Sequence, residues 1–346
     1  MFENSPISEK IINYFTNKYN SKVAVVGLLK ALSVVSPFKN NYLPNFNVLH
    51  VSPSRQFKTQ TSREARNLFG ALRKDEYPWI ELPSDVTMNA ILENYRKGKI
   101  ADLGRKCLFI DDGTILLRTK TVKTKERLIG GLTQLLSDGI WGYGEREEPE
   151  LFLIGHVSMV INLTLESYER NKNTLFSSTF LERFLTVFYV LEDREIIEWL
   201  NSEKEKRSIR WEDKLIKIKF KKNENVNPFD DKTRERLIDV AKKYSVLSLK
   251  SINGQYDLIR ALVISHAALN EREVCDDDFK LLEILENYLV DPLASNEPRI
   301  VAMRLEGKSV RDICAELGKD YESYKPYVHK VIKKAIVRGI IPKGGG

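Results

Sequence analysis

The sequence has few of the residues that build disulfides or metal sites, with three cysteines and four histidines among 346 residues. Cys107, Cys275 and Cys314 lie far apart, so they form neither a metal-ligand spacing nor a disulfide framework, and they indicate a reducing compartment. No apolar run approaches the roughly 18 residues that a membrane span needs. The first residues also lack the layout of a signal peptide. These absences together predict a cytoplasmic protein.

The bulk composition is that of a soluble globular protein, with 42% hydrophobic and 30% charged residues. The length allows two or three domains. The net charge of +7 with a pI near 9.0 favours polyanionic partners. It is equally typical of a surface rich in Lys and Glu, as in many thermophile proteins.

The middle of the chain alternates short apolar runs with helical patterns, which predicts an α/β fold with a mostly parallel sheet covered on both faces. The expected strands are 46–51, 107–110, 152–162 and 186–191. The expected helices between them are 60–73, 84–96, 124–137 and 194–203. Ligands in such folds bind at the carboxyl ends of the strands.

Four units follow from these patterns: an N-terminal helical segment over 1–45, an α/β core over 46–203, a linker and helical domain over 204–290, and a C-terminal unit over 293–346. The first unit is expected to hold two amphipathic helices, ended by the region from Pro37 to Pro44. In the third, residues 204–224 form either a charged connector or, around 215–220, a short strand. The remaining helices are expected at 231–244, 254–269 and 276–289.

Glycine is missing where it would be most informative. The stretch from Phe46 to Thr59 has the layout of a strand, a loop and a Lys-Thr pair that opens a helix, as in the phosphate-binding loop G-x-x-x-x-G-K-[ST]. Ser52 and Phe57 stand in the two glycine places. The backbone around a phosphate normally needs glycine, because its amides must turn inward and approach closely. Phe57 is therefore the larger departure.

This loop predicts a nucleotide site that binds ATP and Mg²⁺. The candidate nucleotide-binding residues are Ser54, Arg55, Gln56, Phe57, Lys58 and Thr59. Lys58 would contact the β- and γ-phosphates, and Thr59 would bind the magnesium ion.

Two further apolar runs end in residues that suit such a site. Asp111 and Asp112 follow the run 107–110, so Asp111 would hold magnesium and Asp112 would polarise the attacking water. The alternative is an ordinary Asp-Asp-Gly turn. Asn162 ends the run 152–162 and could reach the γ-phosphate or the attacking water. Arg183 precedes the last strand and could act on the nucleotide of a neighbouring subunit, or be a surface arginine at a helix end.

With these motifs the chain resembles the AAA+ ATPases, and within them the branch that contains the minichromosome-maintenance helicases. The segment Ser178–Phe184 is similar to the Leu-x-Arg-Phe finger motif of that branch. The segment Leu258–Phe279 is similar to its lid helices, and this long match carries most of the resemblance. The chain departs from the family at both loop glycines. It also has Asn253 where the lid arginine is expected.

Gly139 to Arg146 lies where the resembling motors carry a hairpin that faces a central pore. Trp141, Tyr143 and Arg146 are residue types that stack on bases and pair with phosphates, so they are candidate DNA contacts. The alternative is a plain glycine-rich turn with a core tryptophan.

The C-terminal unit predicts three helices, over 298–305, 309–317 and about 321–338, with Ser309 as a cap and Gly318 as a stop. From residue 293 onward, eleven Lys and Arg stand against six Asp and Glu. A short pair followed by a longer basic helix is typical of helix-turn-helix DNA binding, here in a winged form with Ile340-Ile341 starting the wing. The candidate DNA contacts are Lys325, His329, Lys330, Lys333 and Lys334. The alternative is a protein-docking helical bundle.

Two functions from different classes remain open. The first is a DNA-associated ATPase that acts as an oligomer, a ring or a spiral, in replication initiation, unwinding or remodelling in a mobile element. It would bind double-stranded or single-stranded DNA. The second is a DNA-binding or scaffold protein that keeps the motor fold and has lost turnover. The missing glycines, Asp112 and Asn253 favour the second.

Overall fold

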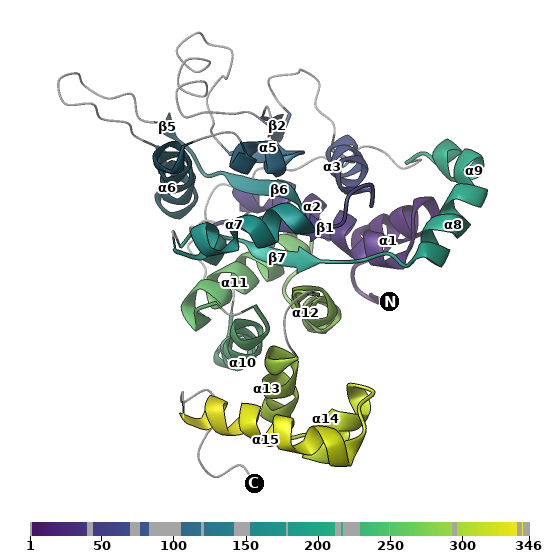
Figure 1. The fold of residues 1–346 in the computed structure, drawn as a ribbon. Coiled ribbons are helices and arrows are strands. Elements are labelled where there is room, and N and C mark those ends of the chain that lie inside the picture. The colour runs from purple at the N-terminus through teal and green to yellow at the C-terminus, as the bar shows by residue number, and fades with distance from the viewer. Residues whose placement is uncertain are drawn as a thin grey trace, which may run out of the picture.

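The structure, a computed structural model, describes residues 2–39, 44–69, 77–82, 105–118, 121–141, 153–177, 179–211, 216, 229–248, 250–292, 296–337 and 341. Its centre is a five-stranded sheet of order β2-β3-β6-β1-β7, in which every neighbouring pair is parallel. The strands are β1 (Val48–Ser52), β2 (Trp79–Glu81), β3 (Cys107–Ile110), β6 (Ser158–Thr164) and β7 (Leu185–Phe188). The predicted α/β class with a parallel sheet is confirmed (Figure 1).

The predicted strands differ from the observed ones in two places. The run 152–162 divides into β5 (Leu153–Ile154) and β6, and β5 pairs antiparallel with β4 (Ile140–Trp141) in a separate two-stranded sheet. The edge strand β2 was not predicted, since three half-exposed or exposed residues carry no periodic signal. The helix expected at 84–96 lies outside the described residues. Of the strand around 215–220, only Ile216 is described, and it bridges to Phe69.

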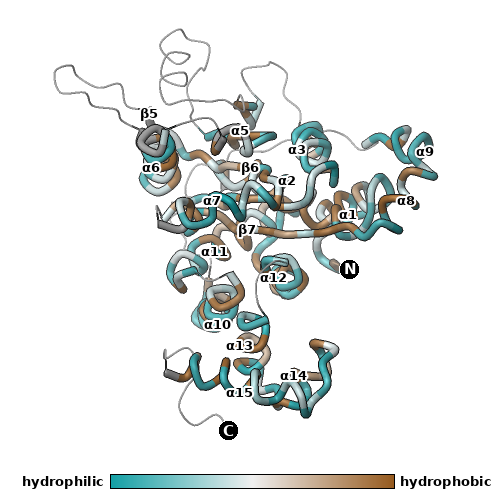
Figure 2. The backbone as a smooth tube through the Cα atoms, viewed as in Figure 1, coloured by the Kyte–Doolittle hydropathy of each residue, from teal (hydrophilic) through white to brown (hydrophobic). Residues whose placement is uncertain are grey.

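Alternate side chains of the strands enter two separate cores, as a buried parallel sheet requires. Val48 and Val160 belong to one core, and Leu49 and Ile161 to the other. The first core is covered by α2 (Ser21–Lys39) and α3 (Lys58–Asn67), and the second by α5 (Gly113–Arg118), α6 (Val122–Asp138) and α7 (Leu165–Ser177). Figure 2 shows the apolar residues gathered along β6 and β7, between these layers.

Helix α1 (Pro6–Lys18) is amphipathic as predicted, but α2 is not. Nearly all of α2 is buried, and it continues through Pro37 instead of ending there. The window Ser21–Phe38 is long and apolar enough to cross a membrane, so the expectation that no run approaches this length is wrong. Because 83% of that window is buried inside the molecule, it is accounted for as the central helix of the first core.

The helical domain is present as α10 (Asp231–Ser248), α11 (Ile252–Leu269) and α12 (Asp276–Leu289). It does not form a core of its own, since Leu262 and Leu285 share the first core with Phe15 and Val48. Helix α11 packs against α2, and α12 packs against β7. Two short helices, α8 (Asp193–Asn201) and α9 (Glu203–Ser208), follow β7 and lie beside α1 (Figure 1).

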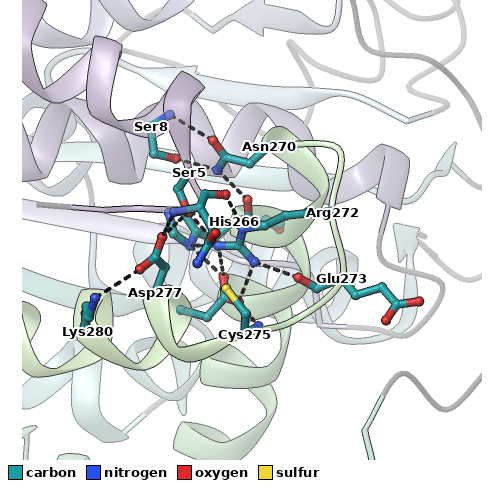
Figure 3. Close-up of polar contacts among 12 residues, drawn as sticks. Ser5, Ser8, His266, Asn270, Arg272, Glu273, Cys275, Asp277 and Lys280 are labelled. Carbon is teal, nitrogen blue, oxygen red and sulfur yellow. Dashed lines mark hydrogen bonds and ion pairs between the residues drawn. The ribbon is translucent and has the colours of Figure 1, made fainter.

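A polar cluster joins the first residues of the chain to the turn between α11 and α12 (Figure 3). The Asp278 carboxylate accepts hydrogen bonds from Arg272 Nη1 at 2.7 Å and from the Cys275 amide at 2.7 Å, and it lies 2.6 Å from His266 Nδ1. Asp277 accepts from the hydroxyl of Ser5 at 3.0 Å. These bonds hold the N-terminal segment against the helical domain.

The C-terminal unit consists of α13 (Glu297–Leu305), α14 (Val310–Glu316) and α15 (Tyr321–Val337), and these three predicted helices are confirmed. They lie next to one another at the C-terminal end of the molecule (Figure 1) and enclose a third apolar core. Ser309 caps α14 by accepting from the Asp312 amide, and Gly318 ends it with a φ of +61°. Pro326 is the sixth residue of α15 and lies inside the helix. Of the expected wing, only Ile341 is described, and it is buried in this core.

Lys250, in the link between α10 and α11, makes the stability depend on pH. Its buried ammonium donates to the Phe184 carbonyl and to Thr186 Oγ1. Burial lowers the pKa of Lys250 to about 7, against a weaker opposing effect of Glu182. Between pH 7 and 8.5 the unfolded chain therefore binds more protons than the folded one, and the free energy of unfolding is expected to rise with pH.

Urea unfolding at pH 7, 7.75 and 8.5 measures this slope. In Lys250→Met the rise is expected to be shallower, because one proton-linked group is gone, while Lys242→Met on the exposed face of α10 should keep the wild-type slope. An unchanged slope in Lys250→Met would show that Lys250 does not titrate in this range.

Candidate functional site

The strand order brings three chain segments to one point. The chain leaves β1 through α3 toward the β2 edge of the sheet, whereas it leaves the neighbouring strand β6 through α7 toward β7 at the opposite edge. Adjacent strands whose connections part in this way leave a crevice at their carboxyl ends, which is where open α/β sheets bind ligands. The loop Pro53–Phe57 and Asp111 lie at these carboxyl ends. Asn162 does not end its strand as predicted, because β6 continues to Thr164, but its amide nitrogen lies 3.3 Å from the carbonyl oxygen of Asp111 and 3.4 Å from that of Lys58.

The loop backbone has the conformation that glycine usually supplies. Phe57 has a φ of +63° and Arg55 a φ of +62°, in the left-handed region that costs a side chain about 1 kcal/mol or more. The Phe57 ring is buried against Tyr19 and Trp199, with ring centroids 5.0 and 4.8 Å apart. Aromatic packing therefore offsets the backbone strain, and Phe57 anchors the loop to α1 and α8.

Lys58 opens α3 and bends back over the loop. Its Nζ donates to the carbonyl oxygens of Ser52, at 2.8 Å, and Pro53. Burial lowers the pKa of Lys58 to about 8, while the nearby Asp112 carboxylate opposes this shift. The ammonium lies at the positive end of a helix, where anions bind well.

The other loop candidates divide into exposed and inward-turned side chains. Ser54, Arg55 and Thr59 are exposed. Gln56 is buried, and its amide exchanges two hydrogen bonds with the backbone of Leu191, at 3.0 and 3.3 Å. Gln56 therefore ties the loop to the segment after β7, and its side chain is not free for a phosphate.

Asp111 lies at the end of β3 and pairs with an arginine that the sequence analysis missed. Arg66 of α3 places Nη2 3.0 Å from Asp111 Oδ2, and its guanidinium lies over the Phe109 ring. The other oxygen, Oδ1, is buried and has no hydrogen-bond partner within the described part of the chain. Because Asp111 and Arg66 are 45 residues apart in sequence, no local pattern indicates this pair.

The oxygen donors at this site can be compared with the ligands that Mg²⁺ prefers. The orphaned Asp111 Oδ1 and the exposed Thr59 hydroxyl are hard oxygen ligands of the kind Mg²⁺ prefers. No group of three or more His, Cys, Asp or Glu side chains suited to a metal occurs among the residues described. The chemistry of these donors suits an ion that takes its other ligands from water and substrate phosphates, as Mg²⁺ usually does.

Asp112 and Asn162 are both engaged within the protein. Asp112 is exposed, and its Oδ1 accepts from the Thr114 amide at 3.0 Å, so it caps the start of α5. Asn162 is buried, and its Nδ2 donates to Ser62 Oγ at 2.9 Å. Its Oδ1 accepts from Lys30, at 2.9 Å, a residue that sequence reasoning also missed. A single lysine inside the otherwise apolar run 23–35 was the available signal.

Arg183 is not brought to this site within one chain. It ends the short 3₁₀ helix η2 (Phe180–Arg183) before β7, and the register pairs Val48 with Leu185. Arg183 therefore lies at the amino ends of the strands, about 16 Å from the loop at roughly 3.3 Å per strand residue. Its charge acts on Asp257 of α11, where it opposes the effect of burial on the pKa of that carboxyl.

The predicted DNA contacts are described only in part. The Trp141 side chain, Tyr143 and Arg146 lie outside the described residues. On α15, three basic side chains share an exposed face: His329, Lys330 and Lys333. Lys325 is half-buried with its ammonium 5.1 Å from the Tyr321 ring centroid, and Lys334 pairs with Glu297 at 3.1 Å.

Two comparisons with known proteins found no match. No protein-family model matches the chain, and no curated protein matches it. The function is therefore inferred from the arrangement of the residues themselves.

Proposed function

We propose that this chain is a DNA-associated ATPase of the AAA+ type that acts as an oligomer. The observation that carries the proposal is Lys58, which opens α3 after β1 and the loop Pro53–Phe57, near the two acids that follow β3. A cation at a helix N-terminus, with the crevice of a parallel sheet next to it, is a recurrent arrangement for binding phosphates.

In this proposal the loop amides and Lys58 bind the triphosphate, and Thr59 and Asp111 hold Mg²⁺. The ion would neutralise negative charge on the phosphates while the γ-phosphoryl group is transferred to water. Asp112 and Asn162 would order the attacking water, although each now bonds within the protein. Asp112 is the shorter acid at a place usually held by glutamate, so we expect slow hydrolysis.

Arg183 supports the oligomeric part of the proposal. Arg183 lies at the amino ends of the strands, whereas Lys58 lies at their carboxyl ends. It can therefore reach a nucleotide only if that nucleotide belongs to a neighbouring subunit. We propose that α10 to α12 act as the lid and that α13 to α15 form a winged helix. Electron micrographs with ATP and DNA test this assembly: rings or spirals with density through them would support it, and monomers alone would overturn it.

A second candidate function has specific support. The Arg66–Asp111 pair neutralises the carboxylate that would hold magnesium, and Phe57 fills a place that glycine normally holds. Both favour a motor fold that binds DNA without turning over ATP. An ATPase assay separates the two candidates, since ATP binding without hydrolysis in the presence of DNA would favour the second.

The exposed face of α15 is expected to contact duplex DNA. Replacing Lys330 and Lys333 by glutamate should weaken duplex binding at low salt by about 10-fold or more and lower the salt dependence by roughly one to two phosphate contacts, because each phosphate contact contributes to counterion release. Fluorescence anisotropy over 50 to 200 mM salt measures both quantities.

The matched control for this prediction is Lys242→Glu on α10, which is also exposed. It should bind duplex DNA like the wild type. Equal binding by the Lys330/Lys333 variant and the wild type would move the DNA contact away from α15, toward the segment that contains Trp141.

A further inference from the structure

A buried lysine lies directly beneath the candidate loop. Lys30, on α2, has no exposed surface, and its Nζ lies within hydrogen-bond distance of four oxygen atoms from two other elements, which share its three N–H groups. These are the carbonyl oxygen of Lys58 at 2.9 Å, Thr61 Oγ1 at 2.8 Å, Ser62 Oγ at 2.9 Å and Asn162 Oδ1 at 2.9 Å. The first three belong to the start of α3, and the fourth belongs to β6.

This position is a costly one for an ammonium group. None of the four acceptors is a carboxylate, and Lys58 and the positive end of α3 lie close by. Burial lowers the pKa of Lys30 well below its usual value, Asp111 opposes this shift, and Lys58 and Arg66 add to it. An apolar side chain like the neighbouring Leu29 would fill this space at less cost. Packing alone therefore does not account for Lys30.

The hydrogen bond to Asn162 has a geometric consequence. An ammonium group can only donate, so it must face the oxygen of the Asn162 amide, which fixes the amide orientation. The amide nitrogen then donates to Ser62 Oγ at 2.9 Å and lies 3.3 Å from the carbonyl oxygen of Asp111 and 3.4 Å from that of Lys58. The Asn162 donor is thus held between the two segments that carry the candidate phosphate and metal residues.

We propose that Lys30 is a positioning residue of the candidate nucleotide site, which acts by fixing the amide of Asn162. This inference depends on the proposed function, because it concerns the same site. The residue acts through Asn162 and touches neither substrate nor metal. Lys30 and Asn162, which are 132 residues apart in the sequence, are thereby held in a fixed relative orientation.

A double-mutant cycle tests the proposal in the full chain. ATP affinity is measured by equilibrium titration for the wild type, Lys30→Met, Asn162→Ala and the double variant. Each single change is expected to weaken ATP binding about 10-fold, the lower range for residues that orient a ligand-binding group. If Lys30 acts through Asn162, the double variant should be within about 2-fold of Asn162→Ala alone.

Additive losses, or no loss in Lys30→Met, would overturn the inference while leaving the proposed function intact. Absence of ATP binding by the wild type would instead overturn the proposed function. If Lys30→Met does not fold, Lys30→Gln, whose side chain is one atom shorter and uncharged, is judged by the same cycle.

Lys250→Met is the matched control, because Lys250 is also a buried lysine that donates to uncharged oxygens, but it lies at the opposite edge of the sheet. It is expected to change stability and leave ATP affinity within about 2-fold of the wild type. An equal loss of ATP affinity in both lysine variants would show that general destabilisation is the cause, and would overturn the role of Lys30.

Discussion

Replacing Lys58 by alanine is expected to weaken ATP binding by about 10- to 100-fold. Hydrogen bonds to charged groups contribute about 1.5–3 kcal/mol, and each 1.4 kcal/mol is a factor of ten in affinity. The Lys58 ammonium is held over the loop backbone by hydrogen bonds to the Ser52 and Pro53 carbonyl oxygens. Among the described residues of the loop, no other cation is held in this way. Isothermal titration of ATP into the wild type and the variant measures the difference.

The pH dependence gives a second reading of the same residue. Because burial lowers the pKa of Lys58 to about 8, its ammonium is increasingly lost above that pH. ATP affinity of the wild type is therefore expected to fall between pH 7 and 9, and the affinity of Lys58→Ala should change less over this range. Arg63→Ala, an exposed cation on the same helix, serves as the control and should keep both the wild-type affinity and its pH dependence. Equal ATP affinity in wild type and Lys58→Ala would contradict the site.

Replacing Asp278 by asparagine is expected to lower the free energy of unfolding by about 3 kcal/mol or more. The Asp278 carboxylate is fully buried and pairs with Arg272 while it bonds His266. Removing one partner of a buried ion pair leaves the other charge uncompensated, which typically costs about 3–5 kcal/mol. Urea unfolding at pH 7 measures the loss.

Acid unfolding checks the same pair through its titration. Burial by itself raises the pKa of Asp278, but the hydrogen bonds from His266 and Arg272 outweigh it and hold the pKa below the ordinary value of 3.8. The stabilisation is therefore fully present above that value and is lost as the pH falls through the lower, folded-state pKa. The variant should lack this part of the acid-induced loss.

Asp276 provides the matched control, because it lies on the same first turn of α12 with an exposed side chain paired to Arg236. Asp276→Asn is expected to match the wild type in urea unfolding, since exposed ion pairs contribute little. If Asp278→Asn also matched the wild type, the cluster would not hold the N-terminal segment in place.

Features that repeat along the chain could be predicted from the sequence alone. Apolar periodicity indicated the parallel sheet, the helices of the third unit and the three C-terminal helices. Local side-chain chemistry set the Ser309 cap and the Gly318 stop. Those signals depend on residues within about one turn of each other. They failed where context decides, as at β2, which is too short for a period, and at α2, whose continuation through Pro37 is stabilised by burial on all sides.

The contacts that connect the residues of the candidate site arise only in the folded chain. Lys30 lies 132 residues from Asn162, and Arg66 lies 45 residues from Asp111, so neither pair leaves a local pattern. The loop itself shows the same division. Lys58 is recognisable from its place after a strand, but Phe57 is tolerated only because Tyr19 and Trp199 pack against its ring. The physical reason is that motif spacing is a property of the chain, whereas burial and charge pairing arise between segments that only folding brings together.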